Sequence, residues 1–111
     1  MRIAFCGSMF PAKLQPIVEA IAALPEGSIV VSSNAGGVDR AVIRAALARG
    51  LRVEICPSAW ESLFRKPLRV DHLYAFPGNW RGNTRRMIQA AVDAGIPVTV
   101  EPIDVRRDGA A

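Results

Sequence analysis

The residues of this chain that could do chemistry gather in three short loops, each rich in glycine and small polar residues. The first loop holds Gly7-Ser8, the second runs from Ser33 to Asp39, and the third runs from Pro77 to Thr84, before Arg85 and Arg86. Glycine lets the backbone come close to a ligand, and hydroxyl and amide groups donate hydrogen bonds. With the adjacent arginines, this composition predicts a site for a phosphate-bearing ligand.

The elements that must position these loops are strands and helices in alternation. Short apolar runs predict strands at 2–6, 28–32, 51–55, 70–76 and 96–101, and helical spacing of apolar residues predicts helices at 11–24, 37–50 and 83–95. Pro16 is accommodated if the first helix begins there, and the segment Ser58–Arg69 holds at most one short helix. Asn83 or Thr84 is the expected N-cap of the last helix.

This pattern predicts an α/β, Rossmann-like, three-layer fold with a five-stranded, mostly parallel sheet and helices on both faces. Residues 1–103 are expected to form one domain and 104–111 a flexible tail. In such a sheet, ligands bind beyond the carboxyl ends of the strands, where the strand order reverses. The three loops converge there if the first strand lies between the second and the fourth.

Composition narrows the classes of function. The chain has 111 residues and a net charge of +4, and Lys13 and Lys66 are its only lysines. Arginine suits bidentate phosphate contacts, although a solvated basic surface explains the charge equally well. No apolar run reaches the length of a membrane span, and the first residues enter a strand pattern at once, so we expect a cytoplasmic protein with no membrane contact.

Several kinds of site are disfavoured by what the loops lack. The chain has neither the GxxxxGK[ST] of a P-loop nor GxGxxG after its first strand, and the second strand ends in serine rather than an acid. P-loop NTPases and ordinary dinucleotide binding are therefore disfavoured, and no cofactor is expected. The single histidine, His72, leaves no metal cluster to predict and is expected to be a packed or surface side chain; Cys6 and Cys56 are expected to be free thiols.

Asp39 and Trp60 each leave two interpretations open. Asp39 is expected in the first turn of a helix, where an acid either stabilises the helix dipole or contacts a ligand. Trp60 either covers the pocket or fills the core.

The ordered set of loops resembles the SLOG superfamily, the Rossmann-like domains typified by cytokinin-activating phosphoribohydrolases and DNA-processing protein A, and in particular its small stand-alone bacterial and phage members. The matching stretches cover nearly the whole chain in order: Gly7-Ser8, "SNAGGVD" at 33–39, "PSAW" at 57–60, "AFPG" at 75–78, "GNT" at 82–84 and "AGIPV" at 94–98. The resemblance implies nucleotide binding, and relatives commonly form homodimers.

The chain also departs from the family pattern. Met9 stands where arginine is common, Ser33-Asn34 replace a glycine pair, and Asn79-Trp80-Arg81 widen the third loop. The phosphoribohydrolases have a glutamate after the threonine that matches Thr84, and this chain has none there. Cleavage of an N-glycosidic bond needs a carboxylate near the anomeric carbon, so the resemblance implies binding more firmly than hydrolysis.

Three functions follow from these observations. The favoured one is binding of a phosphate-bearing small molecule: a nucleotide, a nucleotide sugar or an ADP-ribose-type ligand. The expected binding residues are Gly7, Ser8, Ser33, Asn34, Gly36, Gly37, Pro77, Gly78, Trp80, Arg81, Gly82, Asn83, Thr84 and Arg85. The alternatives are a nucleoside 5′-monophosphate phosphoribohydrolase with Asp39 as the catalytic acid, and a nucleic-acid-binding module, which is not favoured because no aromatic stacking platform is evident.

Overall fold

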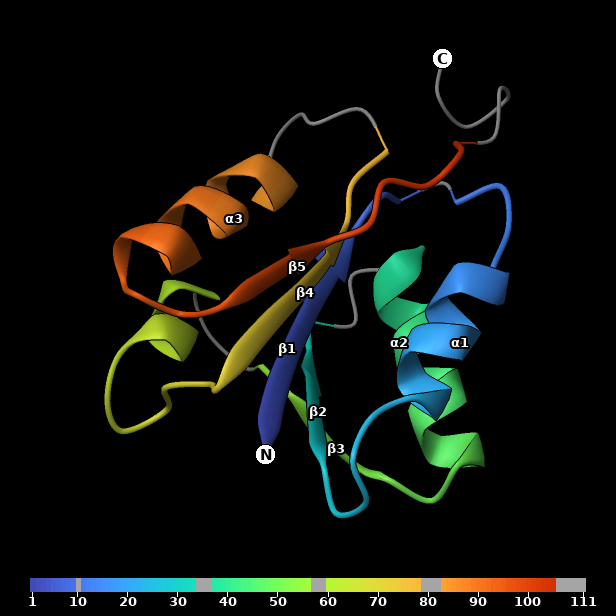
Figure 1. Cartoon of the computed structure of the whole chain (residues 1–111), viewed down its shortest axis with the longest axis horizontal. Helices are drawn as coiled ribbons and strands as arrows, with labels where there is room; N and C mark the ends of the chain where they lie inside the picture. Colours follow the sequence, from blue (N-terminus) through green and yellow to red (C-terminus); the bar gives the residue numbers. More distant parts are fainter. Residues whose placement is uncertain (10, 34–36, 57–59, 79–82, 106–111) are drawn as a thin grey trace.

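Five strands and three α-helices alternate along the chain in the computed structural model, which describes residues 1–9, 11–33, 37–56, 60–78 and 83–105 (Figure 1). Their bounds are β1 Arg2–Gly7, α1 Gln15–Ala22, β2 Ile29–Ser32, α2 Val38–Ala48, β3 Arg52–Ile55, the 3₁₀ helix η1 Trp60–Phe64, β4 His72–Phe76, α3 Asn83–Asp93 and β5 Val98–Val100. The short helix expected within Ser58–Arg69 is therefore the 3₁₀ helix η1.

The strands form one sheet in the order β3-β2-β1-β4-β5, and each neighbouring pair is parallel. β1 lies at the centre, with Ile3 opposite His72 and Gly7 opposite Phe76 in the pairing with β4. The predicted α/β fold is confirmed, and β1 lies between β2 and β4, which is the condition under which the three loops were expected to converge. The strand order reverses at β1, so the carboxyl ends of β1, β2 and β4 lie together at the upper edge of the sheet in Figure 1.

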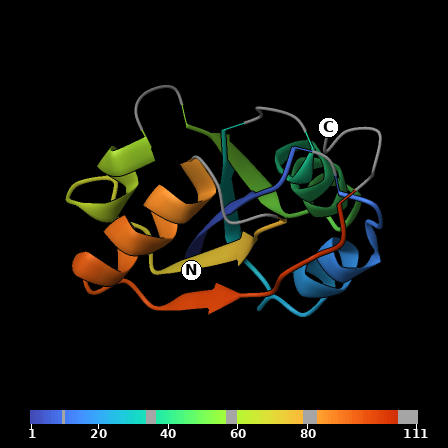
Figure 2. The ribbon, with the colours of Figure 1, turned by 90° about the horizontal axis from the view of Figure 1, so that it is seen from above.

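Helices cover both faces of the sheet, as the continuous apolar strands require (Figure 2). α1 and α2 cover one face over a core that includes Phe5, Val30 and Phe76. α3 and η1 cover the other face over a core that includes Val31, Leu73 and Phe64. The three-layer architecture follows directly from these two cores.

The outer surfaces of α1 and α2 carry exposed apolar residues as well as polar ones. In α1, Pro16 lies in the first turn, and Ile17 is buried, whereas Leu14 and Val18 are 48% and 45% exposed. In α2, Leu47 is 62% exposed and lies outside the buried face of the helix. Val38, Val42 and Ala46 face the sheet at intervals of four residues, and Leu47 lies about 100° further around the helix.

The chain beyond β5 crosses the upper end of the sheet and contacts two of the loops. The backbone N–H of Ile103 donates to the carbonyl of Pro77, and the N–H of Ala12 donates to the carbonyl of Asp104. Val105 then pairs with Pro11 as an isolated antiparallel bridge. Ile103 is 9% exposed and joins the core under α1, so these residues pack onto the domain.

Candidate functional site

Backbone and hydroxyl hydrogen bonds link the loops at the carboxyl ends of the central strands. The N–H of Ser8 donates to the carbonyl of Phe76 (3.1 Å), and the N–H of Val38 donates to the carbonyl of Ser8 (3.0 Å). The hydroxyl of Thr84 donates to the carbonyl of Gly7 (3.3 Å). The ends of β1, β4, α2 and α3 therefore meet around Gly7 and Ser8, as the sequence predicted.

Gly37 is held in a backbone conformation that suits only glycine. Its φ is +55°, and a Cβ placed there would overlap the carbonyl oxygens of Ser8 (2.5 Å) and Met9. The second loop therefore presses its backbone against the first loop immediately before α2 begins. This close approach is the physical reason for a glycine at this position.

Gly78 makes a second close approach, in this case to the chain beyond β5. A Cβ at Gly78 would overlap the side chain of Val105 and lie 3.0 Å from the hydroxyl oxygen of Ser8. Ser8, Gly78 and Val105 thus pack together at the reversal of the strand order. Val105 is not among the predicted site residues, because no motif or periodicity marks it.

Asp39 lies in the first turn of α2 and is 9% exposed. Its carboxylate accepts a hydrogen bond of 2.7 Å from the Ser33 hydroxyl, and its backbone carbonyl accepts one from Ser32. The position favours a negative charge because the helix N-terminus is the positive end of the dipole. Within the described chain, Asp39 thus holds the end of β2 to the start of α2.

Cys6 lies near this carboxylate at the end of β1. Burial, and then the negative charge of Asp39, raise the pKa of the Cys6 thiol to about 12. The thiol is therefore neutral at physiological pH and does not act as a nucleophile there. Cys6 and Cys56 are both free thiols, as expected.

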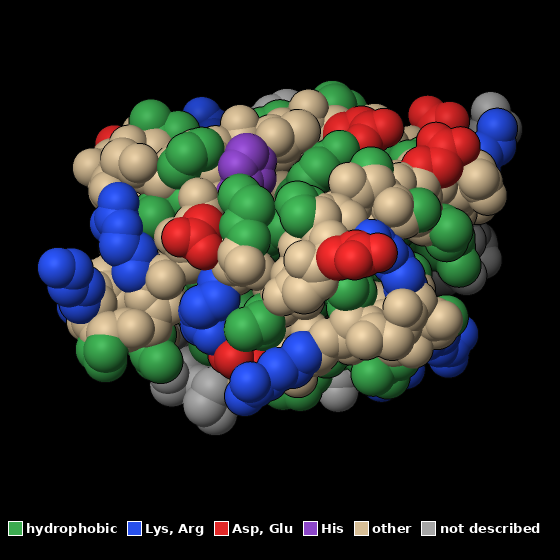
Figure 3. Space-filling model, turned by 60° about the horizontal axis from the view of Figure 1, so that its bottom comes forward, with side chains coloured by type: hydrophobic (Ala, Val, Ile, Leu, Met, Phe, Trp, Pro, Cys, Tyr) green, Lys and Arg blue, Asp and Glu red, His purple; other side chains and the backbone are tan. Residues whose placement is uncertain are grey.

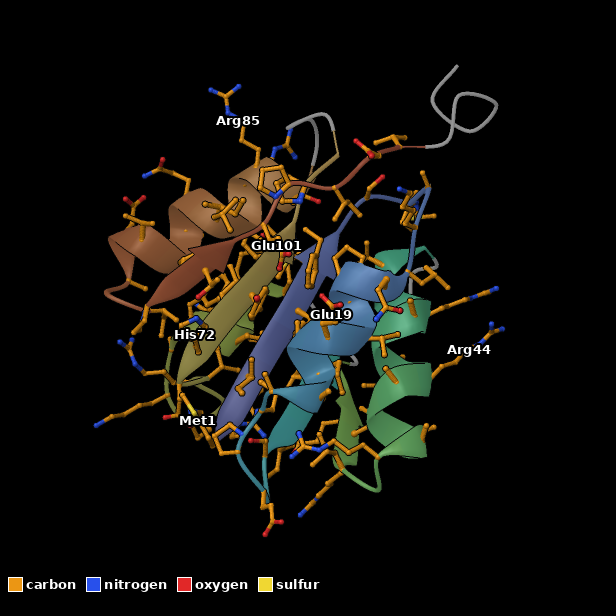
Figure 4. All side chains as sticks on the ribbon, turned by 45° about the vertical axis from the view of Figure 1, so that its right-hand side comes forward. Met1, Glu19, Arg44, His72, Arg85 and Glu101 are labelled. Carbon is orange, nitrogen blue, oxygen red and sulfur yellow. The ribbon has the colours of Figure 1, made fainter. Side chains whose placement is uncertain are left out.

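Two α-helices begin at this edge of the sheet. α2 starts at Val38 and α3 at Asn83, so their positive dipole ends lie at the same end of the fold. The N–H of Val38, the first of α2, donates to the carbonyl of Ser8. Arg85 extends upward from the first turn of α3 into solvent (Figure 4). Thr84 lies inside α3, and its hydroxyl donates to Gly7 rather than capping the helix.

Several predicted binding residues lie outside the described part of the chain: Asn34, Gly36, Trp80, Arg81, Gly82 and the side chain of Asn83. The structure brings together Gly7, Ser8, Gly37, Pro77, Gly78 and Thr84, and it places Ser33 with Asp39 on the β2 side.

Trp60 and His72 lie away from these loops. Trp60 packs edge-on against Phe64 in the core under α3, and His72 hydrogen-bonds Thr99 across β4 and β5. Both residues have packing roles in the structure. Among the described residues, no three His, Cys, Asp or Glu side chains are placed to share a metal ion.

Comparison of the chain with protein-family models, with curated proteins and with solved structures gave no match. Within the described ranges, no helix is both long enough and apolar enough to cross a membrane. The arrangement of the loops is therefore the basis on which a function is proposed.

Proposed function

We propose that this chain binds a nucleotide or a nucleotide derivative through its phosphate, at the carboxyl edge of β1, β2 and β4. The observation that carries the proposal is the convergence of two helix N-termini on the loop Gly7-Ser8, at the point where the strand order reverses. The positive dipole ends of two helices favour binding of an anion at this edge. In open α/β sheets, ligands bind at this point.

Arginines supply the complementary charge. Arg85 is exposed on the first turn of α3, and within the described chain its guanidinium has no hydrogen bond or ion pair. Arginine binds phosphate in a bidentate manner, so Arg85 is the described side chain that we assign to the phosphate. The SLOG-type resemblance supports the same ligand class and is part of the proposal, as are a homodimer and a cytoplasmic location.

Hydrolysis of the bound nucleotide is the alternative, with Asp39 as its carboxylate. The hydrogen bond from Ser33 and the burial of Asp39 favour a positioning role for this residue within the β2–α2 connection. Incubation with a panel of nucleoside monophosphates, followed by chromatography of the free bases, separates the two functions. We expect no release of base; release that Asp39→Asn abolishes would establish the hydrolase.

Binding itself is tested by replacing Arg85. We expect Arg85→Glu to lower the affinity for a nucleoside phosphate by about tenfold or more, since a charge-assisted contact is lost and a repulsive one is gained. The matched control is Arg52→Glu, which makes the same change of charge on an exposed residue at the start of β3, the amino-terminal end of that strand. Calorimetry provides the affinities, and equal effects of the two substitutions would contradict the assignment.

The described lower face of the molecule gives no support for nucleic-acid binding. On the face that carries the lower end of the sheet in Figure 1, arginines are interspersed with aspartates and glutamates rather than gathered in one basic patch (Figure 3). Arg2, for example, forms an ion pair with Glu54 there. A melting temperature raised by short DNA, with no shift from any nucleotide, would favour this third function.

A further inference from the structure

An apolar groove runs between the outer sides of α1 and α2. Its volume is about 440 Å³, and it is lined by Leu14, Val18, Ile21, Ala22, Ala41, Arg44, Ala45, Ala48 and Arg49. This volume falls within the ~300–1,000 Å³ that is typical of small-molecule sites. None of its residues belongs to the loops at the carboxyl edge, so the groove is a separate feature of the molecule.

Apolar residues that are only partly buried give the groove its shape. Leu14 and Val18 form one wall and remain about half exposed, while Ile21 and Ala41 form the floor and are 1% and 9% exposed. Ala45 and Ala48 on α2 are too small to close the opposite wall. An elongated apolar group laid along this groove would cover the exposed surfaces of Leu14 and Val18.

The charges at the groove have a single sign. Arg44 and Arg49 are the charged residues of the lining, and no acid is among them. Arg49 is engaged, because its Nη1 donates to the carbonyl of Ile21 at 2.7 Å. Arg44 extends from α2 into solvent and, within the described chain, has no hydrogen bond or ion pair (Figure 4). An isologous contact with a second copy would bring these like charges together, which disfavours a dimer through this face.

We propose that the groove binds a single-chain amphipathic carboxylate, with its alkyl chain against Leu14, Val18 and Ile21 and its carboxylate on Arg44. We assign a free monoacyl anion rather than a membrane lipid, because the groove volume of about 440 Å³ lies in the lower part of the range of small-molecule sites. The alkyl chain contributes affinity by leaving water, and Arg44 selects the anionic head group. This function is independent of nucleotide binding at the sheet edge.

The test uses the purified full chain with laurate, below its micellar concentration, and with the neutral alcohol dodecanol. We expect saturable binding of laurate. Arg44→Gln is expected to weaken the binding of laurate about tenfold while leaving that of dodecanol unchanged. Arg40→Gln, an exposed arginine of α2 outside the lining, is the matched control and should change neither affinity.

A second pair of variants tests the apolar part of the groove. Ala45→Met should weaken binding of both laurate and dodecanol by filling the groove, whereas Ala23→Met, at an exposed alanine outside the lining, should not. The proposal is overturned if laurate fails to bind, if Arg44→Gln and Arg40→Gln have equal effects, or if the protein binds anionic lipid vesicles but not laurate. A concentration-dependent dimer in sedimentation that Ala45→Met abolishes would assign the groove to a second copy instead.

Discussion

At the scale of a single residue, Gly37 brings the second loop against the first, so replacing it should measurably destabilise the fold. Gly37→Ala should lower the free energy of unfolding by more than about 2 kcal/mol. The left-handed backbone costs alanine about 1 kcal/mol, and the added Cβ also overlaps the backbone of Ser8 and Met9. Urea denaturation measures this cost. Gly27→Ala is the control, since Gly27 also has a positive φ (+77°) but an added Cβ meets nothing within 4 Å. Equal costs for the two substitutions would contradict the close approach.

The Cys6 thiol makes stability depend on pH in a defined window. Burial and the charge of Asp39 raise the pKa of this thiol from 9.0 to about 12 in the folded protein. Above pH ~9 the unfolded chain loses this proton while the folded chain keeps it, so the free energy of unfolding falls by up to about 1.4 kcal/mol per pH unit toward pH ~12. Cys6→Ala should remove this part of the slope in unfolding measurements made from pH 8 to about 11. If Cys6→Ala and Cys56→Ala gave the same slope of unfolding free energy against pH, the predicted role of the Cys6 thiol would be contradicted.

Contacts at this scale were only partly predictable from sequence. The loop compositions indicated that Gly7, Ser8 and Gly37 lie together, because each loop follows a strand of the predicted parallel sheet. The hydrogen bond from Thr84 to Gly7 was not predictable, since a threonine at a helix start ordinarily caps that helix. The neighbourhood of Cys6 and Asp39 likewise depends on how β1 and α2 pack, which local pattern does not specify.

At the scale of elements, the apolar residues of α1 have two roles: some are buried against the sheet, and others line the groove. Ile17→Ala should destabilise the fold by about 2 to 5 kcal/mol, because Ile17 is fully buried against the sheet. Val18→Ala is the neighbouring control and should change the free energy of unfolding by less than about 0.5 kcal/mol, since Val18 faces the groove and is 45% exposed. Chemical denaturation of both variants measures the difference, and a comparable cost at the two positions would mean that α1 is rotated relative to the sheet.

The elements themselves were largely predictable, because β1 is a continuous apolar run and α2 has apolar residues at clear helical spacing. The bounds were less so: β5 covers three residues, Val98–Val100, where the sequence suggested 96–101. Ile96 packs into the core but lies outside the strand, so its apolar side chain indicates burial and not pairing within the sheet. The exposure of Leu47 has the same origin, since composition does not reveal how a helix is rotated about its axis.

At the scale of the whole molecule, the chain beyond β5 is expected to contribute to stability. Truncation after Pro102 should cost about 2 kcal/mol or more, because it removes the buried Ile103 and the hydrogen bonds to Pro77 and Ala12. Truncation after Val105 keeps all of these contacts and is the control. Thermal unfolding distinguishes the two variants, and equal melting temperatures would show that these contacts add nothing to the fold.

The central place of β1 also sets an order of events during synthesis. β1 is translated before its partner β4, which begins at His72, so one edge of the central strand stays without its partner until β4 has been made. An unpaired apolar strand edge is a template for pairing with other chains. Nascent chains that end before residue 72 therefore expose an unpaired, aggregation-prone edge of β1. Chaperones should bind such chains less once β4 has been made and has paired with β1.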